Sequence, residues 1–450
     1  MAGAMDETVI IERPWCDPLD AARPFADEPG LLLLFTPDGW TYLARQPERV
    51  LTVRAGDAGD PFADLREGLG PRRAARADGP PFQGGWAGLM CYEFGAWAEP
   101  VALDRLDGWP DLACGLYRSL AAFHPQSRRV LAIGQGETAI QAQARAGGVI
   151  AGLARSTGAA APQGPLAEVV EADSGDAYEA TVESVKQRIA RGEIFQANLA
   201  RRWRARLAPG AGPFTLFERL SAASPAPFAG YLRLEDRAVV SNSPERFIRI
   251  TPGPDGAVAV AEPIKGTRPR GADPAADRAL AEALQADPKD RAENLMIVDL
   301  MRNDLARVAH PGGVTAPTLF ALKTFANVHH LVSTISARLL DGAGPAETIR
   351  AAFPPGSITG APKVQAMKTI AALEPPRGPY CGSLFWAGFD GAMDSSVLIR
   401  TLGCVRSGDH WRVEAGAGAG LTSDSDPHAE RLETEAKIAA ILQGLRGAAA

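Results

Sequence analysis

The sequence predicts a large layered sandwich of helices and strands, of the α/β or α+β class. Apolar residues make up 46% of the 450 residues, which is ample material for a core. The first half carries short apolar runs bounded by Gly, Pro or Asp, as buried strands are. The second half mixes such runs with segments of helical periodicity. The length indicates two to four domains or one unusually large domain.

The first half is predicted to consist mainly of strands. Residues 31–35 and 130–133 are apolar runs with turn residues beside them. Residues 84–92 are apolar and rich in glycine, which is typical of a strand that another backbone approaches closely. We predict an amino-terminal β-rich region over residues 1–155, followed by a linker over residues 156–176 with a composition of Ala, Gly, Gln and Ser.

Signals for both helices and strands are sharper in the remaining region, residues 177–450. Apolar residues three and four positions apart mark helices, and Asp426 followed by Pro427 is a good helix start. The predicted elements are a helix that ends at Gly192, a strand over 195–203, a hairpin of 247–250 with 258–260, and helices over 293–308 and 427–445.

Charge and composition exclude several classes of protein. With 47 basic and 53 acidic side chains the net charge is −6, which argues against a general nucleic-acid binder. The apolar run over 31–35 is far too short to span a bilayer, and Asp6, Glu7 and Glu12 rule out a secretory signal pattern at the amino terminus. The five cysteines are scattered and odd in number, so we expect free thiols in a soluble, cytoplasmic protein.

Two residues near the predicted hairpin are suited to catalysis. Lys265 lies in a tight segment opened by proline and closed by glycine, where a desolvated amine could lose its proton and act as a nucleophile. Most lysines, however, are solvated surface charges. Glu245 precedes the same hairpin and, across adjacent strands, could lie near Lys265. It is either a strand-start carboxylate that pairs with Arg246 or a protonated acid beside a leaving group.

Two further carboxylates, Glu293 and Glu433, lie on helices that are distant in the sequence. Glu430, Glu433 and Lys437 are spaced three and four apart, so they share one helical face. A solvated face with salt bridges is the ordinary interpretation. The alternative is a Mg²⁺ site, because Mg²⁺ takes one or two protein carboxylates and leaves positions for substrate oxygens.

Two glycine-rich segments could face an anion. Residues 355–363 lack the spacing of a nucleoside-triphosphate loop, but they lead into a helix, where free N–H groups favour a carboxylate. Residues 416–420 are a weak dinucleotide signal, since the next helix starts too late. Arg400, on a probable strand, would clamp a carboxylate if it faces the same cavity.

In combination, these segments resemble the chorismate-utilising enzymes, a family that includes anthranilate, isochorismate, salicylate and aminodeoxychorismate synthases. The resemblance is strong over residues 177–445 and weak over the first 150. It implies an α+β fold, a large layered sandwich of two β-sheets flanked by helices, in which 1–155 is a β-rich region of the same fold and 177–450 is the chorismate-binding catalytic region. The motifs that carry it are Ile194–Leu199, Ser243–Arg246, Pro263–Thr267, Ala292–Asp304, His330–Ser333, Ser357–Lys363, Ile399–Thr401 and the last helix.

Two positions discriminate among the reactions of the family. Members that add water to chorismate resemble one another in having a lysine where this chain has Gln196, and anthranilate synthases have alanine where it has Lys265. A lysine at the second position is similar to the aminodeoxychorismate synthase pattern. The resemblance therefore implies conversion of chorismate and ammonia to 4-amino-4-deoxychorismate, a transaminase-class reaction on the route to p-aminobenzoate and folate.

The resemblance also implies a role for each candidate residue. Lys265 would be a covalent nucleophile and Glu245 the general acid, while Glu293 and Glu433 would bind Mg²⁺. The residues implied in substrate binding are His330, Thr359, Gly360, Arg400, Gly418, Gly420 and Lys437.

Ammonia is expected from a separate glutamine amidotransferase subunit, because no cysteine stands in the glycine-flanked context of a class I glutaminase. The alternatives are an anthranilate synthase component I and a non-catalytic chorismate-binding subunit. Lys265 argues against the first, and the presence of both an acid and a nucleophile argues against the second. Phe385 and Trp386 stand where relatives usually have Gly-Tyr, so we expect extra bulk near the substrate pocket.

Overall fold

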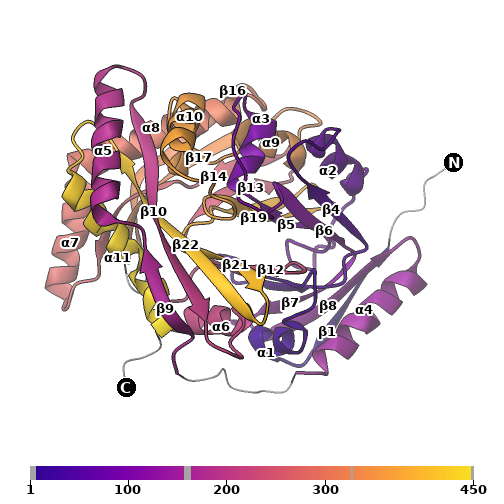
Figure 1. The fold of residues 1–450 in the computed structure, drawn as a ribbon. Coiled ribbons are helices and arrows are strands. Elements are labelled where there is room, and N and C mark those ends of the chain that lie inside the picture. Colours follow the sequence, from indigo (N-terminus) through magenta and orange to yellow (C-terminus); the bar gives the residue numbers. More distant parts are fainter. Residues whose placement is uncertain (1–6, 157–163, 326–327, 447–450) are drawn as a thin grey trace.

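The computed structural model describes residues 7–156, 164–325 and 328–446, and in this part of the chain two large β-sheets stack with helices on their outer faces (Figure 1). One sheet has 12 strands and the other has 10. All the strand pairs within both sheets are antiparallel. The predicted sandwich of two sheets flanked by helices is confirmed.

The larger sheet has the order β1-β8-β7-β3-β2-β11-β12-β21-β22-β10-β18, with β9 paired to β10. Its strands are β1 (Glu7–Arg13), β2 (Leu32–Phe35), β3 (Thr41–Ala44), β7 (Ser119–His124), β8 (Arg129–Gly136), β9 (Ala167–Ala172), β10 (Gln196–Leu207), β11 (Phe228–Arg233), β12 (Arg237–Ser243), β18 (Gly360–Ala361), β21 (Thr401–Ser407) and β22 (His410–Leu421).

The smaller sheet has the order β15-β17-β14-β13-β20-β19-β5-β6-β4, with β16 paired to β17. Its strands are β4 (Arg49–Val53), β5 (Gly85–Met90), β6 (Leu112–Tyr117), β13 (Arg246–Thr251), β14 (Val258–Ala261), β15 (Ile264–Pro269), β16 (Ala309–Thr324), β17 (Val328–Leu339), β19 (Ser383–Gly388) and β20 (Met393–Ser396).

The helices cover the outer faces of both sheets. They are α1 (Pro18–Ala22), α2 (Pro61–Leu69), α3 (Gly95–Ala98), α4 (Ala139–Leu153), α5 (Gly175–Ala190), α6 (Pro213–Ala223), α7 (Pro274–Ala286), α8 (Pro288–Ala306), α9 (Pro345–Ala352), α10 (Lys363–Leu373) and α11 (Pro427–Arg446). Helices α4, α5, α6 and α11 contact strands of the larger sheet, and α2, α7 and α8 contact strands of the smaller one. Within the described ranges, no helix is both long and apolar enough to cross a membrane.

The predicted amino-terminal region, 1–155, supplies strands to both sheets. Strand β2 pairs with β11, and β5 pairs with β19, so the first region and the second are joined by backbone hydrogen bonds. The predicted linker, 156–176, contains a strand, β9, which pairs with β10. Residues 157–163 of that linker lie outside the described residues.

The core consists of three main apolar layers. The middle layer joins β2 and β3 of the larger sheet to β5 and β19 of the smaller sheet. The second layer lies under α6 and α11 on the outer face of the larger sheet, and the third lies under α2, α8 and α9 on the smaller sheet. Trp386 belongs to the middle layer, where it stacks on Phe82 at 5.1 Å between ring centroids. The bulk of Trp386 therefore fills the space between the sheets, whereas Phe385 belongs to the layer under α2, α8 and α9.

Two long helices carry acidic residues to one end of the sandwich. Helix α8 begins where Asp287 accepts hydrogen bonds from the N–H groups of Lys289 and Asp290. Helix α11 begins where Asp426 accepts a hydrogen bond from the N–H of Ala429 at 2.8 Å. Such caps satisfy N–H groups that the helix itself leaves unpaired. Figure 1 shows α11 and α5 beside β10 and β22, the two paired strands that lead to the candidate site.

Candidate active site

Lys265 lies inside the molecule, at an irregular part of β15 where the pairing with β17 shifts register. Its side chain is 14% exposed, and its Nζ is 3.8 Å from Oε2 of Glu293 on α8. A solvated surface lysine is therefore excluded. The amine lies between a strand of the smaller sheet and a helix that carries a predicted metal ligand.

A glycine on the neighbouring sheet leaves room for this amine. A Cβ on Gly420 of β22 would lie 2.5 Å from Nζ of Lys265 and 2.2 Å from Nε2 of Gln196. Gln196, at the start of β10, is buried, and its Oε1 has no hydrogen-bond partner among the described residues. The amine and this amide thus share one small space, next to an amide oxygen that is free to accept a hydrogen bond.

Glu245 is buried at 4% exposure, in the short connection between β12 and β13. Burial raises its pKa to about 7, although hydrogen bonds from Ser357 and from the N–H of Ile264, together with the charge of Lys265, act in the opposite direction. A carboxyl group with this pKa is partly protonated at neutral pH and can donate a proton.

Glu245 and Lys265 were expected to meet across adjacent strands, and this detail is wrong. Strands β14 and β17 lie between β13 and β15 in the sheet. The two residues approach each other because Glu245 accepts a hydrogen bond from Ile264, the residue directly before Lys265. The salt bridges of Arg246 go to Asp394 and Glu262, which leaves Glu245 without the arginine partner that the sequence allowed.

His330 projects from β17 opposite Thr267 of β15, and its Nδ1 is 2.9 Å from the Thr267 hydroxyl. Burial, together with the nearby charge of Arg400, lowers the pKa of His330 to about 4. The imidazole is therefore neutral at physiological pH. Its Nε2 is buried and has no partner in the described part of the chain, so it can form a hydrogen bond with a ligand.

Arg400 stands directly before β21 with a positive φ of 51°. Burial lowers the pKa of its guanidinium, and the charge of Glu245 partly opposes this shift. No hydrogen bond or ion pair joins this guanidinium to another described side chain, while it interacts electrostatically with both His330 and Glu245. A partly buried arginine without a carboxylate partner suits a carboxylate ligand.

The backbone of Thr359 and Gly360 lies against the start of β10, next to Gln196. The hydroxyl of Thr359, which is fully buried, donates to the carbonyls of Pro355 and Gly356, so only its main chain can meet a ligand. Gly360 has a φ of 143°, and a Cβ there would lie 2.1 Å from the carbonyl oxygen of Gln196. Only glycine permits this close approach to β10.

Acidic residues from α8 and α11 face each other beside Lys265. Lys289 Nζ lies 4.0 Å from Glu293 and 3.9 Å from Glu430, so it links the two helices. Burial raises the pKa of Glu293 and of Glu430, and each carboxylate also feels the negative charge of a neighbouring glutamate. The sequence analysis did not select Glu430 or Lys289, although the spacing of four residues between Lys289 and Glu293 was a usable signal.

Glu433 and Lys437, one turn apart on α11, form an ion pair of 2.6 Å at the rim of the site. Burial raises the pKa of Glu433, but Lys437 outweighs it, so the net pKa is lowered. Lys437 also donates to the carbonyl of Gly418 on β22 at 2.8 Å. A Cβ on Gly418 would meet the backbone of Leu199 at 2.7 Å, so this glycine serves strand packing.

The donor chemistry of this acidic region fits Mg²⁺. Glu293, Glu430 and Glu433 offer hard carboxylate oxygens, and their mutual repulsion would be relieved by a bound cation. Three or more His, Cys, Asp or Glu side chains gathered as a complete metal cage are not found among the described residues. The arrangement therefore suits an ion that takes one or two carboxylates and completes its shell with water and substrate.

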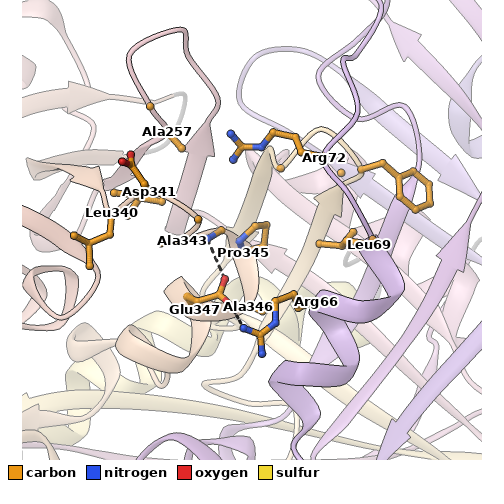
Figure 2. Close-up of a pocket in the computed structure, with 18 residues that line it drawn as sticks. Arg66, Leu69, Arg72, Ala257, Leu340, Asp341, Ala343, Pro345, Ala346 and Glu347 are labelled. Atoms are coloured by element: carbon orange, nitrogen blue, oxygen red, sulfur yellow. Dashed lines mark hydrogen bonds and ion pairs between the residues drawn. The ribbon is translucent and has the colours of Figure 1, made fainter. Parts of the chain in front are cut away.

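A separate surface cavity of about 470 Å³ lies away from these residues (Figure 2). Arg66 and Arg72 face Asp341 and Glu347 across it, and Arg66 forms an ion pair with Glu347. Leu339, at the far end of β17, lines this cavity and lies nine positions along the strand from His330, which is roughly 30 Å. None of the predicted site residues lines it.

Known proteins are similar to this chain over most of its length. The sequence pattern described as chorismate binding enzyme matches residues 29–443. Aminodeoxychorismate synthase component 1 of Klebsiella aerogenes is 37% identical, over 97% of this chain and 98% of that protein. Anthranilate synthase component 1 of Streptomyces coelicolor is also 37% identical, over 94% of this chain and 85% of that protein.

Solved structures show the same fold. Anthranilate synthase component I from Streptococcus pneumoniae superposes with a TM-score of 0.78 at 25% identity, covering 89% of this chain and 92% of that one. The isochorismate synthase MenF of Escherichia coli reaches a TM-score of 0.72 at 19% identity, covering 98% and 95%. The two-sheet sandwich, the match over most of the chain and the similarity to full-length relatives lead to one conclusion: the chain belongs to the chorismate binding enzyme family.

Proposed function

We propose that this protein is the chorismate-aminating component of an aminodeoxychorismate synthase, which converts chorismate and ammonia to 4-amino-4-deoxychorismate. The observation that carries the proposal is the position of Lys265, an almost buried amine beside Glu293, Gln196 and the proton donor Glu245. Relatives named aminodeoxychorismate synthase component 1, at 37% to 41% identity over most of the chain, support it.

The first displacement uses the lysine and the buried acid. After Lys265 has given a proton to water, its amine attacks ring C2, the ring double bonds shift, and the C4–O bond breaks. Glu245 gives its proton to the departing hydroxyl, which leaves as water, because hydroxide itself leaves poorly. The raised pKa of Glu245 keeps the required proton available near neutral pH.

The second displacement forms the product. Ammonia adds at C4, the double bonds return, and the C2–N bond to Lys265 breaks, so that the amine is regenerated. The free Oε1 of Gln196 is an acceptor that can orient the incoming ammonia. Two displacements through a covalent intermediate thus replace a single direct substitution of the C4 hydroxyl by ammonia.

Substrate carboxylates are held, in this proposal, by Arg400 and the backbone at Thr359 and Gly360, with the neutral His330 beside the ring. Lys437, Gly418 and Gly420 shape the wall formed by β22 and α11. Glu293 and Glu433 would hold Mg²⁺, which would neutralise the ring carboxylate when bound. Attack on the ring and protonation of the leaving hydroxyl depend on Lys265 and Glu245.

Ammonia is proposed to come from a separate glutamine amidotransferase subunit, since the relatives' designation as component 1 implies a second component. We further propose that the protein works on the route to p-aminobenzoate and folate, as the names of its relatives suggest. Its five free cysteines are in keeping with a reducing compartment, and we propose the cytoplasm. A second candidate is anthranilate synthase component I, because relatives with that name reach the same identity.

One assay separates the two candidates. The purified chain is incubated with chorismate, Mg²⁺ and ammonium, and the products are separated by chromatography, with a lyase added in parallel to convert 4-amino-4-deoxychorismate to p-aminobenzoate. We expect an aminated product that retains its enolpyruvyl group. Anthranilate with release of pyruvate would refute the proposal and support the second candidate.

A further inference from the structure

A buried arginine outside the predicted site connects two backbone segments that border it. Arg377 follows α10 and is 3% exposed. Its guanidinium donates to the carbonyl of Ile358 at 2.9 Å and to the carbonyl of Asn198 at 2.6 Å. Ile358 directly precedes Thr359, and Asn198 lies two residues after Gln196 on β10. One side chain thus joins the proposed carboxylate loop to the strand that carries Gln196.

The arginine is itself held from two sides. Glu374, whose side chain is 6% exposed, accepts from Nε of Arg377 at 3.0 Å and also accepts from the N–H of Ala200 on β10 at 2.5 Å. The buried carboxylate of Glu93 accepts from the backbone N–H groups of Arg377 and Gly378. Buried charges are costly unless they are fully paired, so this connected set specifies one geometry.

The carbonyls that Arg377 and β10 bind determine how the loop presents its N–H groups. In a trans peptide the C=O and N–H point in opposite directions. The Ile358 carbonyl is held by Arg377, and the Thr359 carbonyl accepts from the N–H of Asn198 at 2.8 Å. The N–H of Thr359, in the first plane, donates to the carbonyl of Gly356 at 3.3 Å, so the N–H of Gly360, in the second plane, is the donor left for a ligand. The direction of this N–H is therefore fixed by contacts on the opposite side of the loop.

We propose that Arg377 is a positioning residue for the reaction: by binding the Ile358 and Asn198 carbonyls it orients the Thr359–Gly360 backbone that grips a chorismate carboxylate. This inference rests on the proposed function insofar as chorismate is the ligand of that loop. It predicts that disturbing Arg377 weakens the use of chorismate more than that of ammonia, because Arg377 binds the Ile358 carbonyl directly before the loop, whereas Gln196 lies two residues from the Asn198 carbonyl that Arg377 binds.

The test compares Arg377→Lys with wild type by steady-state kinetics, with chorismate and ammonium varied in turn. A lysine keeps the charge, but its single nitrogen cannot reproduce the planar set of bonds to two carbonyls and Glu374. We expect KM for chorismate to rise by roughly tenfold or more, kcat to fall less than that, and KM for ammonium to stay within about twofold. Glu374→Gln should raise KM for chorismate by a smaller factor, and it replaces Arg377→Lys if that variant does not fold.

Arg23→Lys is the matched control, because Arg23, directly after α1, forms ion pairs with Asp20 and with the buried Glu218 of α6, neither of which is a site residue. It should lower the melting temperature without changing either KM. The proposal is overturned if Arg377→Lys, or Glu374→Gln in its place, keeps the wild-type KM for chorismate, or if both KM values and kcat change together. Wild type that makes no product from chorismate would instead refute the proposed function, whereas anthranilate as product leaves this comparison valid.

Discussion

Gly420→Ala is the smallest substitution that displaces both Lys265 and Gln196. Gly420 lies in β22 opposite Asn198, and alanine can adopt its backbone conformation without a positive φ. The added Cβ would lie 2.5 Å from Nζ of Lys265 and 2.2 Å from Nε2 of Gln196. Non-bonded heavy atoms prefer about 3.5 to 4.0 Å, so both side-chain ends must retreat by about 1 Å or more.

The two expected effects differ greatly in size. Both clashing atoms are the ends of flexible side chains, so we expect a loss of stability of about 1 kcal/mol, at the low end for an overpacked site. A shift of about 1 Å in a reacting group costs on the order of 10²-fold in rate. Turnover of chorismate with ammonium should therefore fall on the order of 10²-fold, while the melting temperature changes little.

The matched control for this variant is Gly147→Ala on α4, where an added Cβ meets nothing within 4 Å. It should leave turnover and fold intact. A folded Gly420→Ala protein that turns over within about twofold of wild type would show that the amine of Lys265 does not act from the observed position, and the reasoning would be refuted.

Two other substitutions test the acid and the metal. Glu245→Gln should lower kcat by about 10²- to 10⁴-fold. The wild-type rate should decline as pH rises above about 7, where Glu245 loses its proton. A wild-type rate that is flat from pH 6 to about 9 would contradict the role of Glu245 as the acid. Burial raises the pKa of Glu245 from 4.5 to about 7 in the folded protein, so the stability contributed by its neutral form is present below pH 4.5 and is lost as pH rises through 7. Glu245→Gln should therefore have a higher melting temperature than wild type at pH 8 but not at pH 4, as measured by scanning fluorimetry. Glu433→Gln should raise the Mg²⁺ concentration for half-maximal activity by about tenfold with little change in melting temperature, since its side chain is 51% exposed; an unchanged Mg²⁺ requirement would remove Glu433 from the metal site.

Local signals predicted several elements well. The caps at Asp426 and Gly192 and the apolar periodicity gave α11 and the end of α5 nearly in place. The hairpin of β13 and β14 was also predicted, since two short apolar runs flank a proline-glycine turn. These features depend on neighbours in sequence, which is why a single sequence reveals them.

Features that depend on distant segments were not predictable in this way. Strand β16 runs through Pro311 and Pro317, which argue against a strand, yet β16 pairs only with β17 at the edge of its sheet, where proline is tolerated. The pairing of β5 with β19 joins segments almost 300 residues apart, and no local pattern encodes it. Strand order therefore had to come from the family resemblance or the structure.

The candidate site also has residues that local sequence patterns reveal and residues whose roles depend on distant contacts. Lys265 and Glu245 were found through motifs, whereas Glu430 was named on the same helical face as Glu433 but was not selected as a site residue. Its side chain is buried, and its carboxylate accepts a hydrogen bond of 2.7 Å from Ser425, in the turn before α11, which helical spacing alone does not reveal. Arg377 was overlooked for a related reason: its role consists of contacts with two carbonyls that lie 19 and 179 residues away.

The central claim is that Lys265 forms a covalent bond with the substrate, and the mass of the intact protein tests it most directly. Wild type exposed to chorismate without ammonia should gain one chorismate less one water, located by peptide mapping on Lys265 and released again by ammonium. Lys265→Ala should gain nothing. An unmodified wild-type protein that nevertheless converts chorismate once ammonium is added, or a Lys265→Ala protein with undiminished ammonia-dependent turnover, would contradict the account.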